Sequence, residues 1–125
     1  YNYYGCCKMK LLKEAIIEIK KSKFISYCFE VVNVDEVNAI LDDLKKEHKK
    51  AKHFPYAYKI NGQIKKSDDK EPSGTAGMPI LNIIDRNDLN YALIVIVRYF
   101  GGIKLGAGGL LRAYSNTAKE CIKIN

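Results

Sequence analysis

The sequence contains no apolar run long enough to cross a membrane. Its longest apolar stretch, residues 91–97, has the length of one β-strand, whereas a membrane-spanning helix needs roughly 18 or more apolar residues. Its first residues show no succession of basic, apolar and small residues of the kind that marks a secretory signal. We therefore expect a protein that neither enters a membrane nor is secreted.

Cysteine is scarce and irregularly spaced. The four cysteines, Cys6, Cys7, Cys28 and Cys121, include no Cys-x-x-Cys pair, and the adjacent Cys6 and Cys7 cannot readily hold one metal ion together. Cys28 lies in a strand-like run and Cys121 on the apolar stripe of a helix, so both are expected to be small buried hydrophobic residues. This pattern indicates a reducing, cytoplasmic compartment.

Residues suited to catalysis are also few. The chain has two histidines, His48 and His53, no Gly-x-Ser-x-Gly motif, and no base near Ser73 in the sequence. His48 lies among lysines, while His53 opens a predicted strand and has Asp68 and Asp69 as candidate partners in space. The sequence therefore predicts no catalytic constellation and no cofactor.

The net charge of +7 is unevenly distributed along the chain. Residues 1–66 carry 14 lysines against 8 acids, whereas residues 67–125 carry 7 basic and 6 acidic residues. Much of the excess forms one cluster: Lys45, Lys46, Lys49, Lys50 and Lys52. Such a cluster suits nucleic-acid phosphates or an acidic partner, or it is a solvated helix end whose lysines complement the helix dipole. No aromatic residue is interleaved with these lysines, which favours the second interpretation.

Hydrophobic periodicity predicts the order of the secondary-structure elements. A capping-box pattern at Asn33 and Glu36 marks a helix start, and Asn61-Gly62 is a strong hairpin signal. The predicted elements are strands at 14–19 and 23–32, a helix after Asn33, a strand at 53–60, an edge strand or loop at 63–66, a helix at 78–84, a buried strand at 91–100 and a helix at 107–122.

The order β-β-α-β-α-β-α predicts an α+β domain. We expect a two-layer sandwich in which helices pack on one face of a roughly four-stranded sheet. A length of 125 residues with 47% hydrophobic residues suits one domain with its own core. Because residue 1 is Tyr rather than Met, we also expect the chain to belong to a longer polypeptide.

Two segments have compositions that folding alone does not require. The first, residues 68–77, is called the acidic turn here, and it immediately precedes a predicted helix. Free N–H groups at that helix start suit an anion; alternatively Ser73 or Thr75 caps the helix. A divalent cation is a further alternative, although the acid spacing matches no EF-hand loop. The candidate binding residues in this segment are Asp68, Asp69, Glu71, Ser73 and Thr75.

The second segment is the glycine-rich loop at residues 101–109, which connects a strand to the last helix. This arrangement is able to hold phosphate, but the loop lacks the third glycine of GxGxxG, and Ala107 stands where a Walker loop needs Lys. Alternatively, the glycines let the helix pack closely. The candidate binding residues are Arg98, Tyr99, Gly101, Gly102, Lys104, Gly106 and Arg112.

Several segments resemble motifs of the N-terminal domain of the Impact/YigZ family. Residues 68–81 are similar to D-D-G-E-P-S-G-T-A-G-x-P-I-L, and residues 97–114 to V-R-Y-F/Y-G-G-x-K/L-L-G-x-G-G-L-x-R/K-A-Y. Residues 21–25 and 51–58 match shorter family motifs in the same order. The resemblance assigns residues 13–125 to the domain and residues 1–12 to an N-terminal extension. Lys70 departs from the pattern, since the family usually has glycine there.

The resemblance implies a fold like domain 2 of ribosomal small-subunit protein five. It also implies a non-enzymatic binding module in the regulation of translation and the stress response. Eukaryotic members compete for the activator of a kinase that phosphorylates an initiation factor, and bacterial members have been suggested to bind nucleic acid. The implied partners are RNA, the ribosome or a translation-pathway protein, bound by a monomer.

Two alternatives remain open. One is a nucleotide-binding enzyme related to the galactokinase and homoserine kinase fold group, and the other is a purely structural domain of a larger protein. In the leading hypothesis the acidic turn and the glycine-rich loop lie side by side in one solvent-facing cleft. The acids and hydroxyls of the acidic turn, with Arg98, Lys104 and Arg112, would give that cleft its mixed charge. His53 is a further candidate binding residue.

Overall fold

The computed structural model describes residues 2–4 and 9–122, and side chains from residue 13 onward. The elements in chain order are β1 (Asn2–Tyr4), β2 (Met9–Ile19), β3 (Ser22–Glu30), α1 (Val34–Glu47), β4 (Tyr56–Ile60), β5 (Gln63–Ser67), α2 (Gly77–Arg86), β6 (Ala92–Tyr99) and α3 (Gly106–Ile122). No helix of the described part is long and apolar enough to cross a membrane.

The strands form one antiparallel sheet in the order β1-β2-β3-β6-β4-β5. Strand β6 is central, with β3 on one side and β4 on the other. Its residues alternate between the two faces, so that Val95 and Val97 join one buried cluster and Ile94 and Ile96 the other. The nearly continuous apolar sequence of β6 follows from this burial on both faces.

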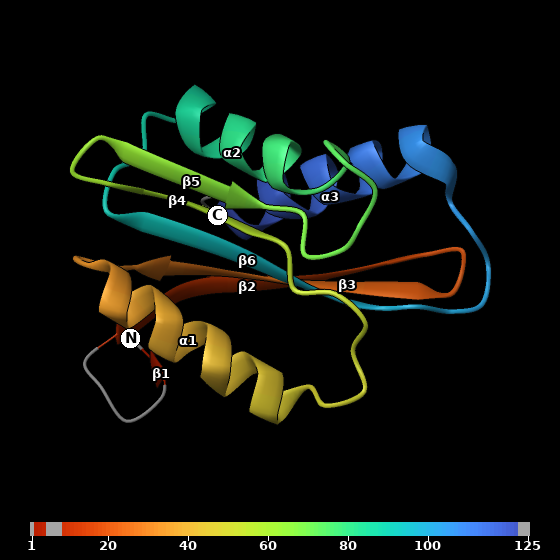
Figure 1. Ribbon diagram of the computed structural model, residues 1–125, viewed down its shortest axis with the longest axis horizontal. Coiled ribbons are helices and arrows are strands. Elements are labelled where there is room, and N and C mark those ends of the chain that lie inside the picture. Colours follow the sequence, from red (N-terminus) through yellow and green to blue (C-terminus); the bar gives the residue numbers. More distant parts are fainter. Residues whose placement is uncertain (1, 5–8, 123–125) are drawn as a thin grey trace.

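The helices cover both faces of the sheet (Figure 1). Ile40 and Leu44 of α1 pack in the cluster with Val95, whereas Ile80 of α2 and Tyr114 of α3 pack in the cluster on the opposite face. The predicted α+β class is confirmed. The details differ from the expectation, because the described residues form a sheet of six strands and α1 lies on the face opposite α2 and α3. Both faces of β3 and β6 are apolar, and each face needs its own cover.

Local sequence signals account for the start of α1 and the β4–β5 hairpin. The Asn33 side chain accepts a hydrogen bond from the Glu36 N–H at 2.9 Å, as the capping pattern predicts. The Glu36 carboxylate accepts from the Val32 N–H at 2.7 Å. Asn61 and Gly62 form the predicted turn with φ of +50° and +78°. The polar run at 63–66 is an edge strand.

Two predicted strands have different limits in the structure. Strand β2 begins at Met9 instead of residue 14. Strand β4 begins at Tyr56, and His53 makes only an isolated bridge with Arg98. Pro55 explains the interruption, since proline has no N–H to donate to a ladder, although its carbonyl accepts from Ile96 at 2.9 Å.

The predicted burial of Cys28 and Cys121 is confirmed. Cys28 and Cys121 are buried with free thiols in the cluster beneath α3. Hydrogen bonding to Cys28 and burial together raise the pKa of Cys121. Cys6 and Cys7 lie outside the described residues.

Candidate binding cavity beside the Glu71–Arg98 ion pair

The carboxylate of Asp68, nine residues before the first residue of α2, caps that helix. Its Oδ1 accepts hydrogen bonds from the N–H groups of Ala76 at 3.1 Å and Gly77 at 2.8 Å, and its Oδ2 from Gly74 at 3.0 Å. Partial burial acts to raise the pKa of Asp68, but these bonds and the charge of Lys66 outweigh it and leave that pKa below its ordinary value. The expected anion position at this helix start is therefore filled by the chain's own carboxylate.

The two predicted capping hydroxyls have other roles. The Thr75 hydroxyl donates to the Pro72 carbonyl at 2.6 Å, inside the acidic turn. Ser73 is exposed. The prediction that Ser73 or Thr75 caps α2 is wrong, because the carboxylate of Asp68 accepts the hydrogen bonds from the N–H groups at the start of this helix.

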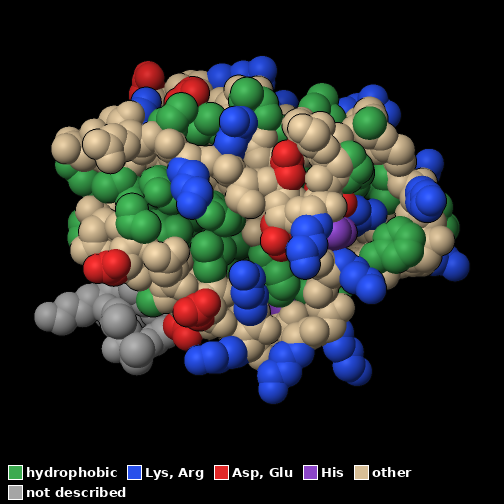
Figure 2. Space-filling view, viewed as in Figure 1, with side chains coloured by type: hydrophobic (Ala, Val, Ile, Leu, Met, Phe, Trp, Pro, Cys, Tyr) green, Lys and Arg blue, Asp and Glu red, His purple; other side chains and the backbone are tan. Residues whose placement is uncertain are grey.

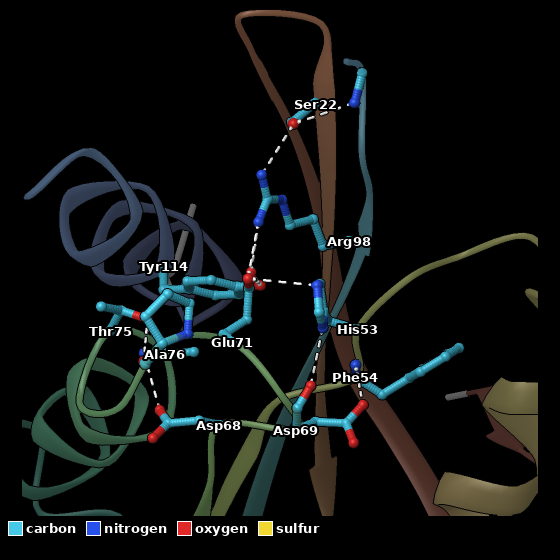
Figure 3. Close-up of polar contacts among 12 residues, drawn as sticks. Ser22, His53, Phe54, Asp68, Asp69, Glu71, Thr75, Ala76, Arg98 and Tyr114 are labelled. Carbon is cyan, nitrogen blue, oxygen red and sulfur yellow. Dashed lines mark hydrogen bonds and ion pairs between the residues drawn. The ribbon is translucent and has the colours of Figure 1, made fainter. Parts of the chain in front are cut away.

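Asp69 joins the acidic turn to the segment that precedes β4. Its Oδ2 accepts from the Phe54 N–H at 2.7 Å, and its carbonyl oxygen lies 2.9 Å from Nδ1 of His53. The anticipated neighbourhood of His53 and Asp69 is present, but the contact uses the backbone of Asp69 and not its carboxylate (Figure 3).

Glu71 is buried and forms the centre of a polar network (Figure 3). Its two carboxylate oxygens accept hydrogen bonds from Nη1 of Arg98 at 2.9 and 2.7 Å. The Tyr114 hydroxyl donates to the same carboxylate. Burial and the nearby charge of Glu71 raise the pKa of Tyr114, which keeps its hydroxyl protonated as a donor. A buried carboxylate needs this number of partners to offset its lost hydration.

His53 completes the network on the side of β4. Its Nε2 lies 3.4 Å from a carboxylate oxygen of Glu71, while its Nδ1 faces the Asp69 carbonyl. Both facing atoms are oxygens that accept hydrogen bonds.

Arg98 retains hydrogen-bonding capacity beyond its pair with Glu71. Its Nη2 lies 3.4 Å from the Ser22 hydroxyl. Its buried Nε has no hydrogen-bond partner among the residues that the structure describes. The guanidinium carbon lies 5.5 Å from the ring centroids of both Phe24 and Phe100, so the cation stands between a core ring and a surface ring.

A cavity of about 400 Å³ opens beside this network. Its walls are largely apolar, and the side chains of Lys52 and Lys104 are exposed at it. The lining residues are Lys52, His53, Glu71, Pro72, Arg98, Phe100, Lys104, Leu105, Gly106, Ala107 and Leu110. The acidic turn and the glycine-rich loop therefore do lie side by side, and both contribute to one cavity.

The glycines of the loop divide between packing and the cavity. A Cβ on Gly101 would lie 2.0 Å from the Lys21 carbonyl oxygen, so only glycine fits against the β2–β3 turn. Gly102 and Gly106 have φ of +89° and +75°, in the left-handed region that favours glycine. Gly106 lines the cavity, and no atom lies within 4 Å of where its Cβ would be. Close packing and an open backbone thus occur at different glycines.

The structure separates some of the predicted candidates from this cavity. Tyr99 points to the opposite face, where its hydroxyl contacts Nδ1 of His48. Arg112 lines a different hollow, with Lys20 and Asn116. His53, Glu71, Arg98, Lys104 and Gly106 line the cavity together. Within residues 2–4 and 9–122, no group of His, Cys, Asp and Glu is placed to hold a metal ion.

Sequence reasoning missed several residues of the site. Tyr114 lies in the predicted last helix and is not among the predicted binding residues, although a buried tyrosine hydroxyl needs a polar partner. Ser22, which contacts Arg98, gave no signal beyond its place in a turn. The apolar lining residues Pro72 and Leu105 stand in the acidic turn and the glycine-rich loop, and Leu110 stands in α3, but which way each side chain points depends on the fold.

The fold and the site define a small α+β domain with a cavity suited to binding. The chain belongs to the Impact family: the Impact N-terminal domain matches residues 20–122, as the sequence motifs predicted. It is 46% identical over 107 residues to the IMPACT family member YvyE of Bacillus subtilis, covering 83% of this chain and 49% of that protein. It is 36% identical over 111 residues to YigZ of Escherichia coli, covering 85% and 54%.

A solved structure described as that of a hypothetical protein has the same fold. It superposes with a TM-score of 0.85 at 33% sequence identity, over 91% of this chain and 59% of the other. The chain spans about half the length of the curated bacterial relatives that it matches.

Proposed function

We propose that this chain is a non-catalytic binding module of the translation and stress-response apparatus, and that it binds RNA on the lysine-rich surface around the Glu71–Arg98 cavity. The family resemblance supports the place in translation. The observation that carries the proposal is the position of the lysine cluster: its last member, Lys52, lines the cavity next to His53.

The charge distribution suits a phosphate backbone. Lys45, Lys46, Lys49, Lys50 and Lys52 are all exposed. Figure 2 shows Lys and Arg side chains gathered on the lower right of this face, where α1 ends, around histidine. Each lysine that neutralises a phosphate releases a condensed counterion, which favours binding at low salt.

The chemistry of Glu71 favours binding over catalysis. A general base needs a free lone pair and access to substrate. Glu71 is buried, its charge is balanced by Arg98, and it also accepts from Tyr114. We infer that this carboxylate shapes the cavity and does not transfer protons.

The test is RNA binding across a salt series, with transfer RNA as the probe. We expect the logarithm of the affinity to fall linearly with the logarithm of the salt concentration, with a slope of roughly −0.7 to −0.9 per contacted phosphate. The variant Lys50→Ala/Lys52→Ala should bind more weakly and with a shallower slope. Lys65→Ala/Lys119→Ala removes the same charge from exposed positions on β5 and α3 and serves as the matched control.

Two outcomes contradict the proposal. One is an affinity that does not depend on salt, which would exclude phosphate contacts as its source. The other is an equal loss in both double variants, which would show that only net charge matters. Binding of ATP in place of RNA, measured as a rise in melting temperature, would favour the nucleotide-binding enzyme instead.

A further inference from the structure

The N-terminus of α3 opens at the cavity. Gly106 and Ala107, the first two residues of this 17-residue helix, both line it. The first turn of α3 contains no acidic residue, whereas Asp68 fills the corresponding position at α2. Backbone N–H groups at a helix start attract anions. Lys104, two residues before the start of α3, also lines the cavity.

Arg98 supplies an independent indication of a ligand in the same cavity. Its side chain is only 5% exposed, yet its Nε has no partner among the described residues. A buried donor without an acceptor in the chain is costly, and its usual partner is a ligand or an ordered water. Glu71 balances only the charge of Arg98, so Lys52 and Lys104 leave the cavity with an excess of positive charge. An anionic ligand would suit this positive charge.

The apolar lining of the cavity suits a ligand that has an apolar part as well as an anionic group. Pro72, Phe100, Leu105 and Leu110 give the cavity apolar surface that inorganic phosphate would leave uncovered. Phe100 is 44% exposed, and the guanidinium carbon of Arg98 lies 5.5 Å from the centroid of its ring. An aromatic ring next to a cationic groove is the combination that binds unpaired bases. A volume of about 400 Å³ lies in the range of small-molecule sites.

We propose that the cavity binds one unpaired nucleotide, with its phosphate at the N-terminus of α3 beside Lys104 and its base against Phe100. The ligand is either a free nucleoside monophosphate or one unstacked nucleotide of an RNA. This inference specifies where RNA would bind in the proposed function. If the ligand is a nucleotide of an RNA, the inference rests on that proposed function. It explains why basic residues, an exposed ring and an open helix start meet at one place.

The first experiment titrates the chain with adenosine 5′-monophosphate, inorganic phosphate and adenosine, and follows backbone amides by NMR. We expect the monophosphate to bind at least about tenfold more tightly than either part alone, because stacking and phosphate contacts then act together. The amides of Gly106, Ala107 and Gly108 should shift with the monophosphate and with phosphate. Equal affinity for monophosphate and phosphate would overturn the base contact, and unchanged amides at Gly106–Gly108 would overturn the phosphate position.

Variants separate the two halves of the site. Phe100→Ala should weaken monophosphate binding about tenfold and leave phosphate binding unchanged. Lys104→Ala should weaken both. Ile103→Ala in the same loop, where Ile103 is 41% exposed and is not a lining residue, and Lys119→Ala on α3 are the matched controls. Melting temperatures near that of the unchanged chain show that each variant is folded. Losses as large in the controls would overturn the assignment.

The second experiment distinguishes the sources of the nucleotide. A single-stranded RNA should lose about tenfold in affinity with Phe100→Ala, while a duplex of equal length should lose nothing, since its bases are stacked. RNA binding that ignores Phe100, with no monophosphate binding, would refute this inference and leave the proposed function standing. Monophosphate binding without any RNA binding would refute the proposed function and keep the cavity as a mononucleotide site.

Discussion

Arg98 and Glu71 connect the centre of the sheet to the acidic turn: one guanidinium nitrogen of Arg98 contacts both oxygens of the Glu71 carboxylate, at 2.9 and 2.7 Å. The two residues are 27 positions apart, and both are buried. The pair fixes the acidic turn against β6 and so places one wall of the cavity.

Glu71→Ala is expected to lower the free energy of unfolding by about 3–5 kcal/mol, because it leaves Arg98 as a buried charge without its counterion. Urea denaturation measures the change. The double variant Glu71→Ala/Arg98→Met removes both charges and should be more stable than Glu71→Ala alone. A double variant no more stable than the single one would show that lost packing, and not the unpaired charge, causes the effect.

Tyr114→Phe should destabilise the fold by about 1.5–3 kcal/mol, since a hydrogen bond to a charged group is lost while the ring remains. Tyr114 is fully buried, and its hydroxyl donates to Glu71. Tyr91→Phe, at a ring that is 40% exposed, is the matched control and should change little. Equal effects in thermal or urea unfolding would argue against the Glu71 contact.

Asp68→Asn should make the stability of the domain less dependent on acid. The pKa of Asp68 in the folded protein lies below its ordinary value of 3.8. The stabilisation that its carboxylate provides is therefore fully present when the pH is above 3.8. This contribution is lost as the pH falls through the lowered folded-state pKa. The difference in unfolding free energy between the unchanged chain and the variant should therefore be largest at pH 7 and shrink toward pH 3.

Asp42→Asn, on the exposed side of α1, is the control for the acid titration. Asp68→Ala removes the cap of α2 altogether and should cost about 1 kcal/mol at pH 7. A difference that grows as the pH falls would contradict the role of the Asp68 carboxylate at α2.

Gly101→Ala should destabilise the domain by about 1–3 kcal/mol, because its Cβ would overlap the backbone of Lys21 and force the loop to move. Gly108→Ala is the informative comparison. A Cβ there meets only the Arg112 side chain at 3.5 Å, within a helix. It should be neutral or stabilising by up to about 1 kcal/mol. The reverse order in melting temperature would contradict the packing assigned to Gly101.

Local signals predicted the elements that depend on neighbours in sequence. The cap at Asn33 and the turn at Asn61-Gly62 are set by a few adjacent residues, so short patterns suffice. The side of the sheet that α1 covers depends instead on the path of the connections. An apolar run such as β6 shows that both faces need cover but not which helix supplies each.

In the candidate site, too, some features follow from the local sequence and others depend on the fold. Composition indicates the two unusual segments, but the Asp68–Gly77 bond depends on how the acidic turn folds back on itself, and the Glu71–Arg98 pair joins segments 27 residues apart. One error was avoidable: Arg98 and Tyr99 were assigned to one surface, although adjacent residues of a strand point to opposite faces. Tyr99 therefore contacts His48 beneath α1 and not the cavity.

Arg98 belongs to a strand with a hydrogen-bonded neighbour on each side. We therefore expect its backbone to open less readily than that of the glycine-rich loop that follows it. In the binding proposed above, the sheet therefore holds the Arg98 cation in place before the ligand arrives. Little affinity is then lost to ordering this charge.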